Sequence, residues 1–183
     1  MFSLLHQVMS RYDPRNICLC IDIDGFRLQD GAFIPRELGW CDGEVKRVGS
    51  LHYDHGYRWE DMTPTECKTI QFVKHRLTGL PFRPSPSERI KYPLREQEDL
   101  EYDILRLYEQ NKNHYCNVVA YKGGTLERNI LEKLQIPSFN LEELSCPQYD
   151  VLVKLYGRTF NCNCHLAGDF HCSEDEVDRK SVV

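Results

Sequence analysis

The chain of 183 residues lacks any hydrophobic run that approaches the roughly 18 residues needed to span a bilayer, so no membrane partner is expected. The apolar start, Met1 to Leu5, is short, and no signal-peptide cleavage pattern follows it. Walker and GxGxxG phosphate loops are also missing, which argues against nucleotide-driven chemistry. The sequence has no internal repeat and no low-complexity tract, so repeat architectures are excluded as well.

An excess of positive charge is missing too, since 23 Lys and Arg stand against 28 Asp and Glu for a net charge of −5. This balance argues against a chain that wraps nucleic acid by bulk charge, but it leaves room for a local basic stripe. A hydrophobic content of 41% and a charged content of 28% are typical of a soluble globular protein. We expect one domain over 1–183, with an N-terminal arm or helix over 1–16.

The nine cysteines are odd in number and scattered along the chain, so they do not predict a disulfide framework. Cys18, Cys20 and Cys116 lie in apolar, strand-like runs, where a cysteine behaves as a small hydrophobic residue. We therefore predict a reducing, intracellular location, cytoplasm or nucleus, with most thiols free and a few bound to metal.

Three strands open the predicted domain. The run 17–24 is apolar enough to lie centrally in a sheet, and 32–40 and 44–53 are also strand-like. Asp30-Gly31 is a strong hairpin turn between the first two. The three strands should form an antiparallel meander.

The rest of the sequence alternates helices with strands. Thr63, Pro64 and Glu66 form a helix start with a capping box. Helices are predicted over 63–78, 95–112, from Gly124 to about Leu134 and over 150–156, strands over 116–121 and 139–141, and a proline-rich loop over 79–93. The predicted fold class is therefore α/β, with a mixed sheet flanked by helices.

The motif Cys162-x-x-His165-x6-Cys172 places three zinc donors within one short segment. Zinc in structural sites is tetrahedral, and a carboxylate can complete such a trio. Cys164 competes for the fourth position, although its place beside His165 strains simultaneous binding; the absence of any metal is the other alternative. A closed four-ligand site would hold Zn²⁺ as a structural cofactor, without an open position for an activated water molecule.

Two carboxylates on the first predicted strand form a second candidate site. Asp22 and Asp24 are two residues apart, so they point to the same face of the sheet. Such a pair repels itself unless a divalent cation such as Mg²⁺ or Mn²⁺ neutralises it. The alternative is a strand that simply ends in an aspartate-rich turn.

A group of basic side chains follows the first predicted helix and continues into the proline-rich loop. Positive charge interleaved with aromatic residues suits single-stranded nucleic acid, although an ordinary solvated loop explains it equally well. The candidate RNA-binding residues are Lys74, Arg76, Arg83, Arg89 and Lys91.

Asp22-x-Asp24 on a first strand, in a β-β-β-α-β-α order, resembles the DEDDh exonucleases of RNase H-like fold, whose first strand carries Asp-x-Glu. His171 and Glu176 resemble the His-x-Ala-x-x-Asp of that family, with Cys172 in place of Ala and Glu in place of Asp. The resemblance implies that His171 is the general base and that Glu176 binds the catalytic metal. No Asp follows the fourth predicted strand, where this family has another one.

The cysteine motif is similar to that of the Maelstrom domain of the germline small-RNA pathway, which has an RNase H-like fold with a Glu-Cys-His-Cys zinc site. This resemblance implies that Cys162, His165 and Cys172 bind zinc, with Glu127 as the fourth ligand. It also implies a role in small-RNA or transposon silencing, with RNA and protein partners.

Three functions are compatible with these features. The first, which the missing mid-chain Asp favours together with the third, is a degenerate, zinc-stabilised domain that binds single-stranded RNA or proteins. The second is an active metal-dependent nuclease that uses Asp22, Asp24, His171 and Glu176. The third is a purely structural domain that docks other proteins.

Overall fold

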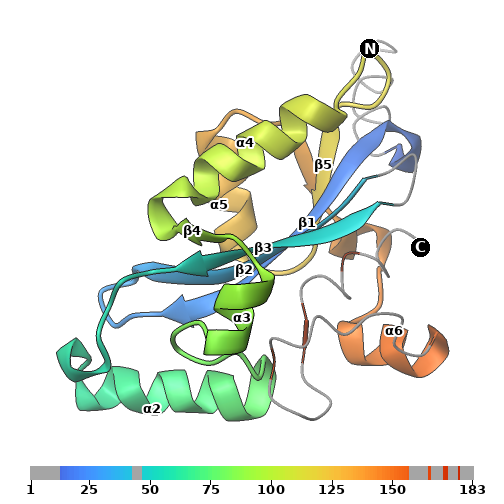
Figure 1. Ribbon diagram of the computed structural model, residues 1–183. Coiled ribbons are helices and arrows are strands. Elements are labelled where there is room, and N and C mark those ends of the chain that lie inside the picture. Colours follow the sequence, from blue (N-terminus) through green and yellow to red (C-terminus); the bar gives the residue numbers. More distant parts are fainter. Residues whose placement is uncertain (1–12, 43–46, 157–164, 166–170, 173–176, 178–183) are drawn as a thin grey trace.

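The computed structural model describes residues 13–42, 47–156, 165, 171, 172 and 177. Its centre is a mixed six-stranded sheet in the order β4-β3-β2-β1-β5-β6, with helices on both faces (Figure 1). β1, β2 and β3 are antiparallel, as predicted, whereas β4 runs parallel to β3, β5 to β1 and β6 to β5. The strands are β1 (Ile17–Arg27), β2 (Phe33–Asp42), β3 (Val48–Asp54), β4 (Leu94–Glu96), β5 (Val118–Tyr121) and β6 (Ser138–Asn140). The predicted α/β class with a mixed sheet is confirmed.

The side chains of β1 alternate between two buried layers. Leu19, Ile21 and Ile23 belong to a core cluster that also contains residues of α4 (Leu100–Asn111) and α5 (Thr125–Lys133). Cys20 belongs to the cluster on the other face, with residues of α6 (Tyr149–Tyr156). Because side chains alternate with a period of two, Asp22 and Asp24 lie on the face of α6.

The hairpin between β1 and β2 forms where the sequence predicts it. Gly31 has a φ of 89°, a left-handed conformation that favours glycine. The side chain of Asp30 accepts a hydrogen bond from the backbone N–H of Ala32 at 2.9 Å. This turn fixes the register in which β2 returns along β1.

A β-bulge interrupts the pairing of β1 with β2 beside the two aspartates. Asp24 pairs with Glu37 and Gly25 pairs with Pro35, so Arg36 is an extra residue on β2. Bulges redirect side chains and are frequent next to functional sites. Here both bulge residues are fully buried: Glu37 pairs with Asp24, whereas Arg36 forms an ion pair with Glu88.

We expect Gly25→Ala to destabilise the protein, because a Cβ at this position would lie 2.1 Å from the carbonyl oxygen of Ile34. A clash with backbone forces a shift of the bulge, which should cost about 3 kcal/mol of unfolding free energy. Gly124→Ala is the matched control, since nothing lies within 4 Å of its added Cβ. Urea denaturation of the two variants checks this, and equal stabilities would contradict it.

The first long helix begins as its sequence predicts. Thr63 caps α2 (Pro64–Phe72), and Glu66 closes the capping box. The helix continues as one π-helical turn, η3 (Val73–Leu77), so helical structure extends to the predicted region of Thr78. The carbonyl groups of Leu77 and Thr78, at the end of this helix, accept hydrogen bonds from His171 and His165 in the C-terminal part of the chain.

Two expectations between residues 79 and 112 are wrong in detail. The predicted loop over 79–93 contains a short helix, α3 (Pro86–Lys91), which Ser85 caps. The predicted helix over 95–112 starts only at Leu100, because the preceding residues form β4 against β3 and then a short 3₁₀ turn. Tertiary pairing with β3 overrides the local helical tendency there. Among the described residues, no helix is long and apolar enough to cross a membrane.

Candidate metal and catalytic site

Two groups of potential metal ligands lie on the α6 face of the sheet. The cysteine group consists of Glu37, His165 and Cys172, and the carboxylate group of Asp22, Asp24 and His171. In each group, one ligand atom from every residue lies within 4.8 Å of the others. Adjacent strands support the two groups, because Asp24 pairs directly with Glu37.

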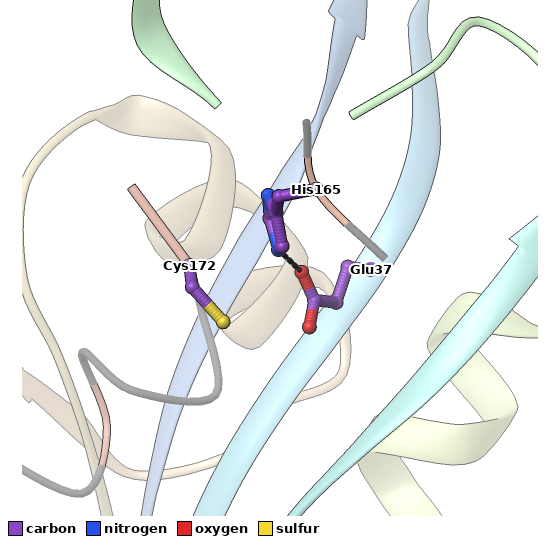
Figure 2. Close-up of side chains that lie close together, drawn as sticks. All are labelled: Glu37, His165 and Cys172. Atoms are coloured by element: carbon purple, nitrogen blue, oxygen red, sulfur yellow. Dashed lines mark hydrogen bonds and ion pairs between the residues drawn. The ribbon is translucent and has the colours of Figure 1, made fainter. Parts of the chain in front are cut away.

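The cysteine group is buried and compact (Figure 2). His165 Nε2 lies 3.0 Å from Glu37 Oε2, and the sulfur of Cys172 lies beside both residues. The other ring nitrogen of His165, Nδ1, donates to the carbonyl oxygen of Thr78. Cys172 is 4% exposed and packs in a small apolar cluster with Leu80.

The charges of the cysteine group call for a cation. Burial by itself lowers the pKa of His165, but Cys172 and Glu37 beside it outweigh burial and raise that pKa to about 11. A buried place with two anionic ligands is stabilised either by a proton on the histidine or by a divalent metal. The nitrogen, sulfur and oxygen donors fit zinc, and a backbone carbonyl on Nδ1 is the usual outer partner of a histidine that binds metal through Nε2.

The carboxylate beside His165 and Cys172 is Glu37, which the sequence did not lead us to expect, and Glu127 stays a prediction as a zinc ligand. Glu127 is buried in the first turn of α5, whose Ile130 and Leu131 pack in the core on the opposite face of the sheet. Spacing along the chain could not find Glu37, because the β1–β2 bulge brings it to the site. The one signal was a pair of charged residues, Arg36-Glu37, inside an otherwise apolar strand. Cys162 and Cys164 lie outside the described residues.

The carboxylate group brings together three of the four predicted catalytic residues. His171 Nδ1 lies 2.8 Å from Asp24 Oδ2, and Nε2 lies 3.5 Å from Asp22 Oδ2. Asp22 and Asp24 are 6% and 8% exposed. An oxygen-rich set with one histidine fits Mg²⁺ or Mn²⁺. The fourth residue, Glu176, lies outside the described part of the chain.

The end of the α2–η3 helix holds both groups. The backbone N–H of His171 donates to the carbonyl of Leu77 at 3.0 Å, and the ring of His165 donates to the carbonyl of Thr78. Carbonyls at a helix end have no partner within the helix, so they are available for such contacts. The carbonyl groups of two consecutive residues, Leu77 and Thr78, thus accept hydrogen bonds from the histidines of both groups.

A cavity of about 890 Å³ opens beside the carboxylate group. Tyr149 contacts the ring of His171 edge-on, with ring centroids 4.9 Å apart. The cavity combines apolar walls with two cationic side chains and is lined by Asp24, Arg76, Leu77, Thr78, Tyr149, Asp150, Val153, Lys154 and His171. Such a mixture suits a ligand that has both apolar and anionic parts.

The five predicted RNA-binding residues separate in the structure. Arg76 lines the cavity, and Lys74 lies on the same turn, η3. Arg83 and Arg89 both pair with Asp54, at 2.9 and 2.6 Å, which offsets their charge. Lys91 lies over the ring of its neighbour Tyr92, 4.9 Å from the centroid.

Sequence reasoning missed Tyr149 and Lys154, which α6 contributes to the cavity. Their only signal was the short amphipathic helix itself. Comparisons of the chain with protein-family models, curated proteins and solved structures found no match.

Proposed function

We propose that the protein is a metal-dependent hydrolase that cleaves phosphodiester bonds in single-stranded nucleic acid, with RNA as its substrate. The observation that carries this proposal is the carboxylate group: two buried aspartates and a histidine from distant parts of the chain meet at one wall of a cavity with cationic side chains.

The sheet supports an RNase H-like scaffold. A meander of three antiparallel strands continues into parallel β5 and β6 on the other side of β1. β1 is central, and it carries the acidic pair. This is the strand order expected for an Asp-x-Asp motif on the first strand of such a nuclease.

One carboxylate, Glu127, follows β5 near the place where the resemblance requires an aspartate. Glu127 is buried in the first turn of the helix that follows β5, and β5 runs parallel beside β1. Helices that follow parallel strands begin at the same edge of the sheet as the ends of those strands. Ile130 and Leu131 of this helix pack in the core on the opposite face of the sheet, and Glu127 does not belong to the carboxylate group, so the proposal rests on Asp22, Asp24 and His171.

Asp22 and Asp24 are the residues that would hold Mg²⁺ or Mn²⁺. A divalent cation bound there neutralises phosphate charge and lowers the pKa of a water molecule. Asp24 Oδ2, 2.8 Å from His171 Nδ1, would accept a proton from that nitrogen, and this tautomer would leave Nε2 as the acceptor of the ring. His171 can then take a proton from water through Nε2, the role of a general base.

The cavity walls account for a single-stranded substrate. Arg76 and Lys154 provide positive charge for phosphate groups, while Tyr149 and Val153 offer surface for a base. Asp150, which forms an ion pair with Lys154 at 3.5 Å, tempers that charge. A cavity of about 890 Å³ is in the size range of small-ligand sites and accepts a nucleotide or two of an unpaired strand.

The cysteine group would hold Zn²⁺ as a structural cofactor, with Cys162 as a candidate fourth ligand. A metal bound there would cross-link β2 to the C-terminal part of the chain, because His165 and Cys172 are far from Glu37 in sequence. A site closed by four protein ligands contributes folding energy and no catalysis.

The test is cleavage of end-labelled single-stranded RNA in the presence of Mn²⁺. Asp24→Asn is expected to reduce the rate by about 100-fold or more, because it removes a metal ligand and the partner of His171. Asp150→Asn, which removes a charge from the same cavity without touching the carboxylate group, should retain activity.

Equal rates for Asp24→Asn and the unmodified protein would contradict the proposal. RNA binding that weakens with salt, but without cleavage, would instead indicate the degenerate RNA-binding domain.

A further inference from the structure

The geometry points to a positioning role for the cysteine group: when it holds its metal, it fixes His171 against the two aspartates of the carboxylate group. The inference rests on the two metal sites proposed above, but not on the nucleic-acid substrate. Its central observation is that His171 and Cys172 are consecutive residues, yet each belongs to a different group.

The two groups are linked at both ends. On the sheet, Asp24 and Glu37 are paired residues of β1 and β2. On the other side, one peptide unit joins His171 to Cys172, and consecutive Cα atoms are about 3.8 Å apart. Fixing the sulfur of Cys172 therefore leaves the backbone of His171 little freedom to move.

Burial identifies which residue anchors the other. Cys172 is 4% exposed and packs against Leu80, whereas the side chain of His171 is 24% exposed at the cavity. Besides its contacts with the aspartates, His171 donates a backbone hydrogen bond to Leu77 and its ring contacts Tyr149. Neither contact fixes a ring as tightly as a metal–sulfur bond one residue away.

The same helix end connects the groups a second time. The carbonyl of Thr78 orients His165, and the carbonyl of Leu77 holds the backbone of His171. Loss of the metal would free His165 and Cys172 together, and with them the segment that presents His171. Outer contacts of this kind change metal affinity about 10- to 100-fold when removed.

The experiment measures Mn²⁺ binding by electron paramagnetic resonance, which needs neither RNA nor catalysis. In the zinc-loaded protein, His171→Ala should weaken Mn²⁺ binding about tenfold. The part of the Mn²⁺ spectrum that disappears in Asp24→Asn identifies the ion bound at the carboxylate group. Chelating the zinc, or replacing His165 by Ala, should weaken binding to the same extent. If His171 acts only when anchored, His171→Ala should have no additional effect on the zinc-free protein.

Cys172→Asp keeps an anionic metal ligand at this position. The variant should therefore retain both zinc and tight Mn²⁺ binding, which separates positioning from general destabilisation. Circular dichroism and hydrogen exchange identify variants that have unfolded. If a variant has unfolded, the comparison uses the unmodified protein, still folded, from which zinc has been removed by a chelator.

The inference is overturned if zinc removal leaves Mn²⁺ affinity unchanged, if the effects of zinc removal and His171→Ala simply multiply, or if zinc-loaded protein binds no Mn²⁺. Absent RNA cleavage combined with coupled Mn²⁺ binding would overturn the proposed function and leave this inference standing.

Discussion

Removal of the metal from the cysteine group is expected to lower the free energy of unfolding by roughly 4 kcal/mol or more, because metal binding at such sites is coupled to folding. The carboxylate of Glu37 is fully buried, and Cys172 lies beside it. Without a divalent cation, a proton on His165, whose pKa Cys172 and Glu37 raise to about 11, and the buried guanidinium of Arg36 offset the negative charge of Glu37. For a protein of this length the melting temperature should fall by about 10 °C.

The measurement is a thermal melt before and after treatment with a strong chelator, together with metal analysis of the purified protein. His165→Ala should reproduce the effect of the chelator. His114→Ala is the matched control, because His114 is exposed and outside both metal groups. Stoichiometric loss of zinc without a change in melting temperature would show that the group is not a structural staple.

Much of the fold follows from local sequence signals. The apolar run of β1, the turn at Asp30-Gly31 and the capping box at Thr63 each predict an element that the structure contains. The alternation along β1 also predicts that Asp22 and Asp24 share one face. These features depend on neighbours within a few residues, so the sequence alone determines them.

The site was less accessible to sequence reasoning, because its partners meet only through the tertiary fold. Glu37 reaches His165 across 128 residues, and its orientation depends on a bulge at Arg36 that spacing along the chain does not reveal. Similarly, α3 was hidden in a proline-rich stretch, although Ser85 and Glu88 form a capping box there. Glu127 stays a prediction as a zinc ligand, and the order of residues does not reveal which face of the sheet its helix covers.

Glu88→Gln should destabilise the protein by about 3–5 kcal/mol, because it leaves the guanidinium of Arg36 buried without its counter-charge. The two side chains are 0% exposed, and Arg36 Nη2 lies 3.0 Å from Glu88 Oε2. Glu88 also contacts His52 Nδ1 at 3.1 Å, so one substitution disturbs both partners. Asp61→Asn, which breaks the surface pair of Asp61 with Arg58, should change stability by less than about 1 kcal/mol.

Chemical denaturation compares the stabilities of Glu88→Gln and Asp61→Asn. The double replacement of Arg36 and Glu88 by Met then tests whether the unpaired charge causes the loss of stability. Removing both charges leaves no unpaired ion, so the double variant should be more stable than Glu88→Gln. Its zinc content should nevertheless fall, since Arg36 is the bulge residue that precedes Glu37 and its anchoring by α3 sets the direction of that carboxylate. A stable double variant with full zinc content would mean that the bulge holds Glu37 in place without the buried ion pair.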